Sequence, residues 1–94
     1  MMYKAFVRDT ETKRRLFMEH DYPSKKEYAR ELRANGYSVT RIEPKALYDF
    51  VLEHTNCRLA EWTRAKKLWK EHLPLTEENM DKLADGATIM ELLA

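Results

Sequence analysis

The stretch that decides the fold is Ser24-Lys-Lys-Glu-Tyr-Ala-Arg-Glu-Leu-Arg-Ala-Asn-Gly36, followed at once by Tyr37-Ser-Val-Thr-Arg-Ile42. Ser24 and Glu27 have the spacing of a capping box, in which each side chain accepts a hydrogen bond from the other residue's backbone N–H. Gly36 suits the left-handed position that ends a helix. The stretch therefore predicts one short helix within 24–36 and a strand that begins directly after it.

Two strand candidates precede this helix, over residues 3–9 and 13–19. In both, side chains alternate between two faces, which is typical of strands with one better-buried side. Thr10-Glu11-Thr12 between them is short enough for a hairpin connection. We therefore predict a ββαβ unit over residues 1–44, with a three-stranded antiparallel sheet in the order 2-1-3.

The predicted helix has an apolar side formed by Tyr28, Ala29 and Leu32, which should pack on one face of the sheet. Phe6 and Phe17 belong to the second face, which is exposed unless helices cover it. Tyr28, Tyr37 and Tyr48 add aromatic surface, but no pattern marks them as a platform for stacking nucleic-acid bases, which usually needs exposed aromatic rings on a sheet.

The remaining chain, residues 45–94, predicts helices. Pro44 suits the first turn of a helix over 44–54, which is apolar nearly all round and should be buried. A longer helix is expected over 57–73, with Thr55 or Asn56 as its N-cap. Its expected apolar face consists of Leu59, Trp62, Ala65, Trp69 and Leu73.

Two short helices should close the chain. Thr76 can cap the first, with Glu77 and Glu78 in its positively polarised first turn, and Gly86 ends it. Thr88 can cap a last turn. The predicted fold class is α+β: an N-terminal three-stranded antiparallel sheet with one crossover helix, then a C-terminal bundle of three to four helices, in a single domain of residues 1–94.

Composition places the chain among globular proteins, with 44% hydrophobic and 35% charged residues. The one cysteine, Cys57, cannot form an internal disulfide, so we expect a reducing, cytoplasmic setting. No apolar run approaches the roughly 20 residues that span a bilayer, so no membrane segment is expected. Residues 1–45 contain eleven Lys and Arg against seven Asp and Glu, whereas residues 73–94 contain one against five. The positive charge of residues 1–45 favours contact with nucleic acid. The alternative is that the basic N-terminal and acidic C-terminal parts neutralise each other in the folded chain.

Catalytic chemistry is not indicated, and no catalytic residue, cofactor or metal is predicted. The three histidines are dispersed, and the two glycines lie in no phosphate-binding loop. His54-Thr-Asn-Cys57 could supply two zinc ligands, but four are normally needed. We expect both residues to be buried structural groups.

The strongest binding candidate is the stripe Lys26, Arg30 and Arg33, whose spacing aligns three cations along one side of the predicted helix. Such a row can contact phosphates, or it is a solvated face partly neutralised by Glu27. Arg41 on the neighbouring strand extends the candidate site.

Lys13 and Arg14, followed by Arg15, form a second candidate just past the predicted hairpin turn. Alternation would divide them between both faces of a basic ribbon that can enter a DNA groove. The competing explanation is that positive charge on a strand prevents edge-to-edge aggregation.

The helix over 57–73 offers an alternative, a basic surface for a protein partner. Its side opposite the tryptophans has the cations Arg64, Lys66, Lys67 and Lys70. The seven-residue spacing of Trp62 and Trp69 is primarily core spacing, and a partner groove is the alternative.

The segment quoted first also resembles small uncharacterised proteins from plasmids, phages and integrative elements of Gram-positive bacteria. The resemblance covers about residues 3–44, and it implies a role in a mobile element or in bacterial DNA handling. It brings no catalytic residues. Our leading hypothesis is a non-enzymatic accessory or regulatory protein that associates with DNA or RNA. The alternative is a protein-interaction module, an adaptor or an inhibitor.

Overall fold

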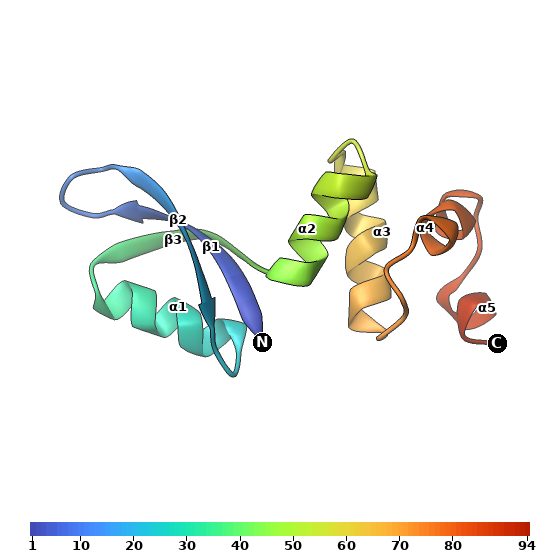
Figure 1. Cartoon of the computed structure of the whole chain (residues 1–94), viewed down its shortest axis with the longest axis horizontal. Helices are drawn as coiled ribbons and strands as arrows, with labels where there is room; N and C mark the ends of the chain where they lie inside the picture. The colour runs from blue at the N-terminus through green and yellow to red at the C-terminus, as the bar shows by residue number, and fades with distance from the viewer. The chain divides into compact units, whose positions relative to one another are not determined.

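The computed structural model describes residues 1–94 and divides into two compact units, Met1–Tyr48 and Asp49–Ala94. The first unit contains β1 (Met2–Asp9), β2 (Arg15–Asp21), α1 (Lys25–Ala34), β3 (Tyr37–Pro44) and the start of α2 (Lys45–His54). The second contains the rest of α2, then α3 (Leu59–Lys70), α4 (Glu77–Ala84) and α5 (Ile89–Leu93). The predicted α+β class is confirmed (Figure 1).

The sheet of the first unit is antiparallel with the strand order β2-β1-β3, as predicted. Helix α1 lies along one face of it (Figure 1). Alternation along β1 turns Tyr3, Ala5 and Val7 toward this helix, because successive side chains of a strand point to opposite faces. The buried cluster is Tyr3, Ala5, Val7, Tyr28, Ala29, Leu32 and Ile42.

The end of α1 forms as the sequence predicts, whereas at its start only the Ser24 half of the predicted capping box forms. The Ser24 hydroxyl accepts a hydrogen bond from the backbone N–H of Glu27 at 3.2 Å. Gly36 has a φ of +87°, the left-handed conformation that glycine adopts without a Cβ penalty. Its carbonyl accepts from both the backbone N–H of Thr10, at 3.0 Å, and the Thr10 hydroxyl, at 2.8 Å. The end of the helix is therefore tied to the β1–β2 loop.

That loop is longer than predicted, and the expected start of the second strand at residue 13 is wrong. Lys13 and Arg14 lie in the loop, Lys13 with a φ of +64°, and the strand begins at Arg15. The cause is Asp9, whose Oδ1 accepts from the backbone N–H groups of Glu11 at 2.8 Å and Thr12 at 3.1 Å. These hydrogen bonds, the one from Thr12 foremost, lower the pKa of the Asp9 carboxyl.

Strand β3 contains a bulge that its sequence pattern did not predict. Val39 pairs with Val7 and Arg41 pairs with Phe6, so Thr40 is an extra residue between them. Strict alternation would place Val39 and Ile42 on opposite faces. The bulge absorbs one residue, and both side chains therefore turn toward α1.

In the second unit, α3 packs against α4 and buries Trp62, Ala65 and Leu68. Three expectations for this helix are wrong. It spans Leu59–Lys70 rather than 57–73, and Leu59 is 82% exposed because it precedes the turn that packs. Arg58 takes the N-cap position in place of Thr55 or Asn56.

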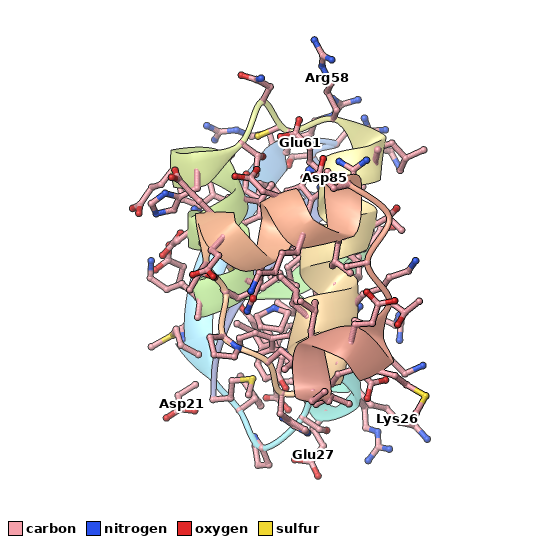
Figure 2. All side chains as sticks on the ribbon, turned by 90° about the vertical axis from the view of Figure 1, so that its right-hand side faces the viewer. Asp21, Lys26, Glu27, Arg58, Glu61 and Asp85 are labelled. Carbon is pink, nitrogen blue, oxygen red and sulfur yellow. The ribbon has the colours of Figure 1, made fainter.

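The start of α3 depends on a carboxylate rather than on a hydroxyl cap. Glu61 accepts hydrogen bonds from the backbone N–H groups of Asn56 at 3.1 Å and Arg58 at 3.3 Å. Figure 2 shows Arg58 and Glu61 at this end of the helix. A carboxylate in the first turn also complements the positive end of the helix dipole.

Three burial expectations in this region are also wrong. Helix α2 is not buried all round, because Leu52 is 48% exposed while Phe50 and Val51 are buried. His54 and Cys57 are both exposed rather than buried. Cys57 is exposed because α2 ends at His54 and the residues after it lie in a loop, while His54 is the terminal residue of that helix. The caps of the last helices are confirmed: Thr76 accepts from the N–H of Asn79, and Thr88 accepts from that of Glu91.

Candidate functional site

The candidate site is the sheet face opposite α1, here called the open face. Pairing of the three strands arranges its side chains in cross-strand rows, because residues directly opposite each other share a face. The rows are Arg15–Arg8–Ser38 near the hairpin, Phe17–Phe6–Arg41 in the middle, and Glu19–Lys4–Glu43 at the far end.

The middle row is aromatic. Phe17 on the edge strand β2 is 65% exposed, and Phe6 beside it is half-buried. Their ring centroids are 6.4 Å apart, and the ring of Tyr48, from the first turns of α2, lies 5.4 Å from Phe6. The three rings form a continuous apolar strip across the open face.

Cations stand over these rings. The Lys4 ammonium lies 5.3 Å from the Phe17 centroid and 4.7 Å from that of Tyr48. The Arg41 guanidinium lies 5.9 Å from the Tyr48 centroid. All three distances are within the range of cation–π attraction. This attraction is stronger where the cation is partly desolvated.

Acidic groups balance only one end of the face. Glu19 pairs with Lys4 at 3.5 Å and with Lys45 at 3.7 Å, and Glu43 accepts from the Arg41 Nε at 3.2 Å. The row nearest the hairpin has no acid.

In that row Arg8 and Arg15 lie directly opposite each other across β1 and β2. Both are exposed, and neither makes an ion pair with a carboxylate. Like charges opposite each other on one sheet face destabilise the pairing. The two arginines, with Arg41, line a hollow of about 600 Å³ that also contains Phe6, Phe17 and Tyr48 and has no carboxylate in its walls. The hollow therefore favours an anionic ligand with an aromatic or apolar part.

The cations singled out from the sequence lie in three places. Lys26 and Arg33 on α1 and Arg41 on β3 line one groove along the edge of the sheet. Arg30 is exposed on the outer side of α1, and Lys26 and Glu27, both labelled in Figure 2, belong to the first turn of that helix. Arg41 borders both this groove and the open-face hollow. Lys13 and Arg14 lie apart from both, in the β1–β2 loop.

The alternative partner surface of α3 is divided between two grooves. Arg64 borders a groove with His54, Glu61 and Glu77. Lys67 and Lys70 border another, beside Leu83 and Ile89. Lys66 is exposed.

His54 and Cys57, the two candidate zinc ligands of the sequence, make separate contacts in the structure. No group of three or more His, Cys, Asp or Glu side chains is placed to hold a metal ion. The Nδ1 of His54 lies 3.2 Å from Glu77 Oε1, and the Cys57 thiol lies 4.0 Å from the Val51 carbonyl oxygen. His54 thus interacts with a carboxylate instead of with Cys57.

Sequence reasoning missed Arg8 and the pairing of Arg8 with Arg15. The available signal was the alternation of residues 3–9, which places Phe6 and Arg8 on one face. The opposition of the two arginines depends on the register, which the loop length fixes.

Comparison with known proteins adds no relative. No protein-family model matches the chain, and neither the curated proteins nor the solved structures contain a significant match. None of the five helices combines the length and apolar character needed to cross a bilayer.

Proposed function

We propose that the protein is a non-enzymatic accessory or regulatory protein that binds nucleic acid through the open face of its sheet. The observation that supports this proposal is the hollow lined by Arg8, Arg15 and Arg41 beside the exposed ring of Phe17, without a carboxylate in its walls. An anionic polymer would relieve the repulsion between the two opposed arginines, because each phosphate it brings neutralises one of them.

The edge groove gives the same ligand a second contact. Arg41 lies at the boundary between the hollow and the groove that Lys26 and Arg33 line. The sugar–phosphate backbone of a nucleic acid that crosses β3 would pass from the arginines of the hollow to the cations of the edge groove. Lys26, Arg33 and Arg41 keep their proposed phosphate-binding role. Lys13, Arg14 and Arg30 would contribute through longer-range attraction.

The proposed biological setting is DNA handling by a bacterial mobile element. It rests on the resemblance of residues 3–44 alone.

Binding can be tested by fluorescence anisotropy with labelled single-stranded and duplex DNA and single-stranded RNA. If three arginines each neutralise a phosphate of a single strand, the log–log salt slope is about −2, and affinity falls roughly 20-fold between about 50 and 200 mM salt. Arg8→Gln/Arg15→Gln should flatten this slope by more than half. Lys66→Gln/Lys67→Gln removes the same charge from the second unit and serves as the matched control.

Two results would overturn the proposal. One is the absence of binding to all three probes at the lower salt concentration. The other is an unchanged affinity in the arginine variant together with a loss in the lysine variant, which would move the interaction to α3.

A further inference from the structure

We infer that the ligand of the open face is a single-stranded nucleic acid, whose bases stack on Phe17 and Phe6 while its phosphates contact Arg8 and Arg15. The inference rests on the proposed function and assigns the ligand class of the same site. The positive charge of the face attracts any nucleic acid, so the ligand class depends on what the aromatic rings recognise.

The first step concerns the exposure of Phe17. A phenylalanine ring buries a large apolar area when it is covered, yet this one is 65% exposed. Its position on the edge strand β2 makes the ring accessible from beyond the sheet as well as from above it. Because every base has a flat π face, an unpaired base can cover such a ring regardless of its identity.

The second step excludes a duplex as the preferred ligand. In a duplex each base face is covered by its neighbours in the stack, so the rings of the open face would meet only sugar, phosphate and groove edges. The strip formed by Phe17, Phe6 and Tyr48 would then gain nothing from contact. A single strand exposes its base faces and can use the strip fully.

The third step is the spacing between rings and cations. Successive residues on one face of a strand are roughly 7 Å apart, so the arginine row lies about that distance from the aromatic row. Phe17 and Arg15 are such neighbours on β2, and Phe6 and Arg8 are such neighbours on β1. One nucleotide can therefore place its base on a ring and its phosphate on the arginine of the same strand.

The fourth step concerns Lys4. Its ammonium group stands over both Phe17 and Tyr48 and pairs with Glu19. A base that stacks on the exposed part of Phe17 would lie next to this ammonium group, which can contact the phosphate of the same nucleotide. The aromatic strip therefore has a cation within reach of a stacked nucleotide.

The experiment compares a labelled oligo-dT of about 12 nucleotides, within the usual site sizes of single-strand binders, with a duplex of the same length. We expect tighter binding of the single strand, and a roughly 5- to 150-fold loss with Phe17→Ala, the effect of removing one base–aromatic stack. Phe17→Tyr should retain the affinity. Leu59→Ala, which removes an exposed apolar side chain of α3 in the second unit, is the matched control and should change little.

The outcomes separate the two proposals. If duplex and single strand bind equally and Phe17→Ala has no effect, the single-strand inference is overturned while nucleic-acid binding stands. If polyglutamate competes as well as oligo-dT at equal charge, the face recognises charge alone and the stacking inference is again overturned. If no nucleic acid binds, the proposed function itself fails.

Discussion

Replacing Tyr28 by phenylalanine should stabilise the first unit. The Tyr28 side chain is 1% exposed, and its hydroxyl is a buried polar atom without a hydrogen-bond partner. The ring stacks on Tyr22, with centroids 4.6 Å apart, and meets His20 edge-on at 5.9 Å. Phenylalanine keeps these ring contacts and removes the unpartnered oxygen.

The magnitude follows from the cost of the hydroxyl. Leaving a buried polar group unsatisfied costs about 1 to 3 kcal/mol, because the group loses its hydrogen bonds to water on folding. Part of this cost is offset by packing around the oxygen, so we expect Tyr28→Phe to raise the free energy of unfolding by about 1 kcal/mol at neutral pH.

The same substitution should change the response to alkaline pH. Burial raises the pKa of Tyr28, and the neighbouring Tyr22 and Glu19 raise it further. A raised pKa in the folded state means that folding opposes ionisation of the phenol, so the stability of the parent is independent of this group below the ordinary tyrosine pKa of 10.0 and falls as pH rises from there through the higher folded value. Phenylalanine does not titrate, so its advantage should grow above pH 10.

Urea unfolding followed by the NMR amide signals of β1 is the appropriate assay, because Trp62 and Trp69 both report on the second unit. Tyr3→Phe is the matched control, since Tyr3 belongs to the same core cluster but has no orphaned buried oxygen. A Tyr28→Phe variant less stable than the parent by more than about 1 kcal/mol would refute the reasoning. It would mean that the hydroxyl makes a valuable hydrogen bond.

Three further predictions concern stability. Gly36→Ala should lower the free energy of unfolding, measured by urea titration, by about 1 to 2 kcal/mol. The cause is backbone strain at a φ of +87°, since the new methyl group would meet only the Thr10 hydroxyl, at an unstrained 3.8 Å. An unchanged free energy of unfolding would contradict the left-handed conformation. NMR titration should give Asp9 a carboxyl pKa below its ordinary 3.8, so that the loop is stabilised above about pH 4 and loosens as pH falls through the lower folded value. An Asp9 that titrates normally would contradict the loop hydrogen bonds. Leu68→Ala should lower the free energy of unfolding by about 2 to 5 kcal/mol, because Leu68 is fully buried. Leu59→Ala should lower it by less than about 0.5 kcal/mol, because Leu59 is 82% exposed. Similar losses would contradict the assignment of Leu68 to the buried face of α3.

Much of the first unit could be predicted because its signals are local. The Ser24 cap and the Gly36 terminus each depend on a few consecutive residues, and both form as expected. Alternation along residues 3–9 correctly divided Tyr3, Ala5 and Val7 from the residues of the open face. These rules act within one element and need no knowledge of its neighbours.

The failures occur where a contact between elements decides the outcome. The start of β2 depends on the side chain of Asp9, which satisfies loop amides and lengthens the turn. In the second unit, the predicted apolar face of α3 is centred on Trp62 and Trp69, whereas the buried face is rotated about the helix axis so that it includes Leu68.

The candidate site was predictable only in part, for the same reason. Arg41 and the helical cations are visible as single residues, but the opposition of Arg8 and Arg15 exists only once the register is set. Alternation places Phe6 and Phe17 on the second face of the sheet, but the exposure of Phe17 also requires that no later helix covers that face, and the sequence offers no local signal for this.

The bulge at Thr40 has a consequence for how chain length can vary. Deleting Thr40 would leave Val39 opposite Val7 and Arg41 opposite Phe6, so every other side chain of β3 would keep its present face. The same deletion within β1 would invert the side chains beyond it, because that strand has no spare residue. Among chains descended from a common ancestor, loss of a single codon would therefore be tolerated at this point of the sheet and selected against in its central strand.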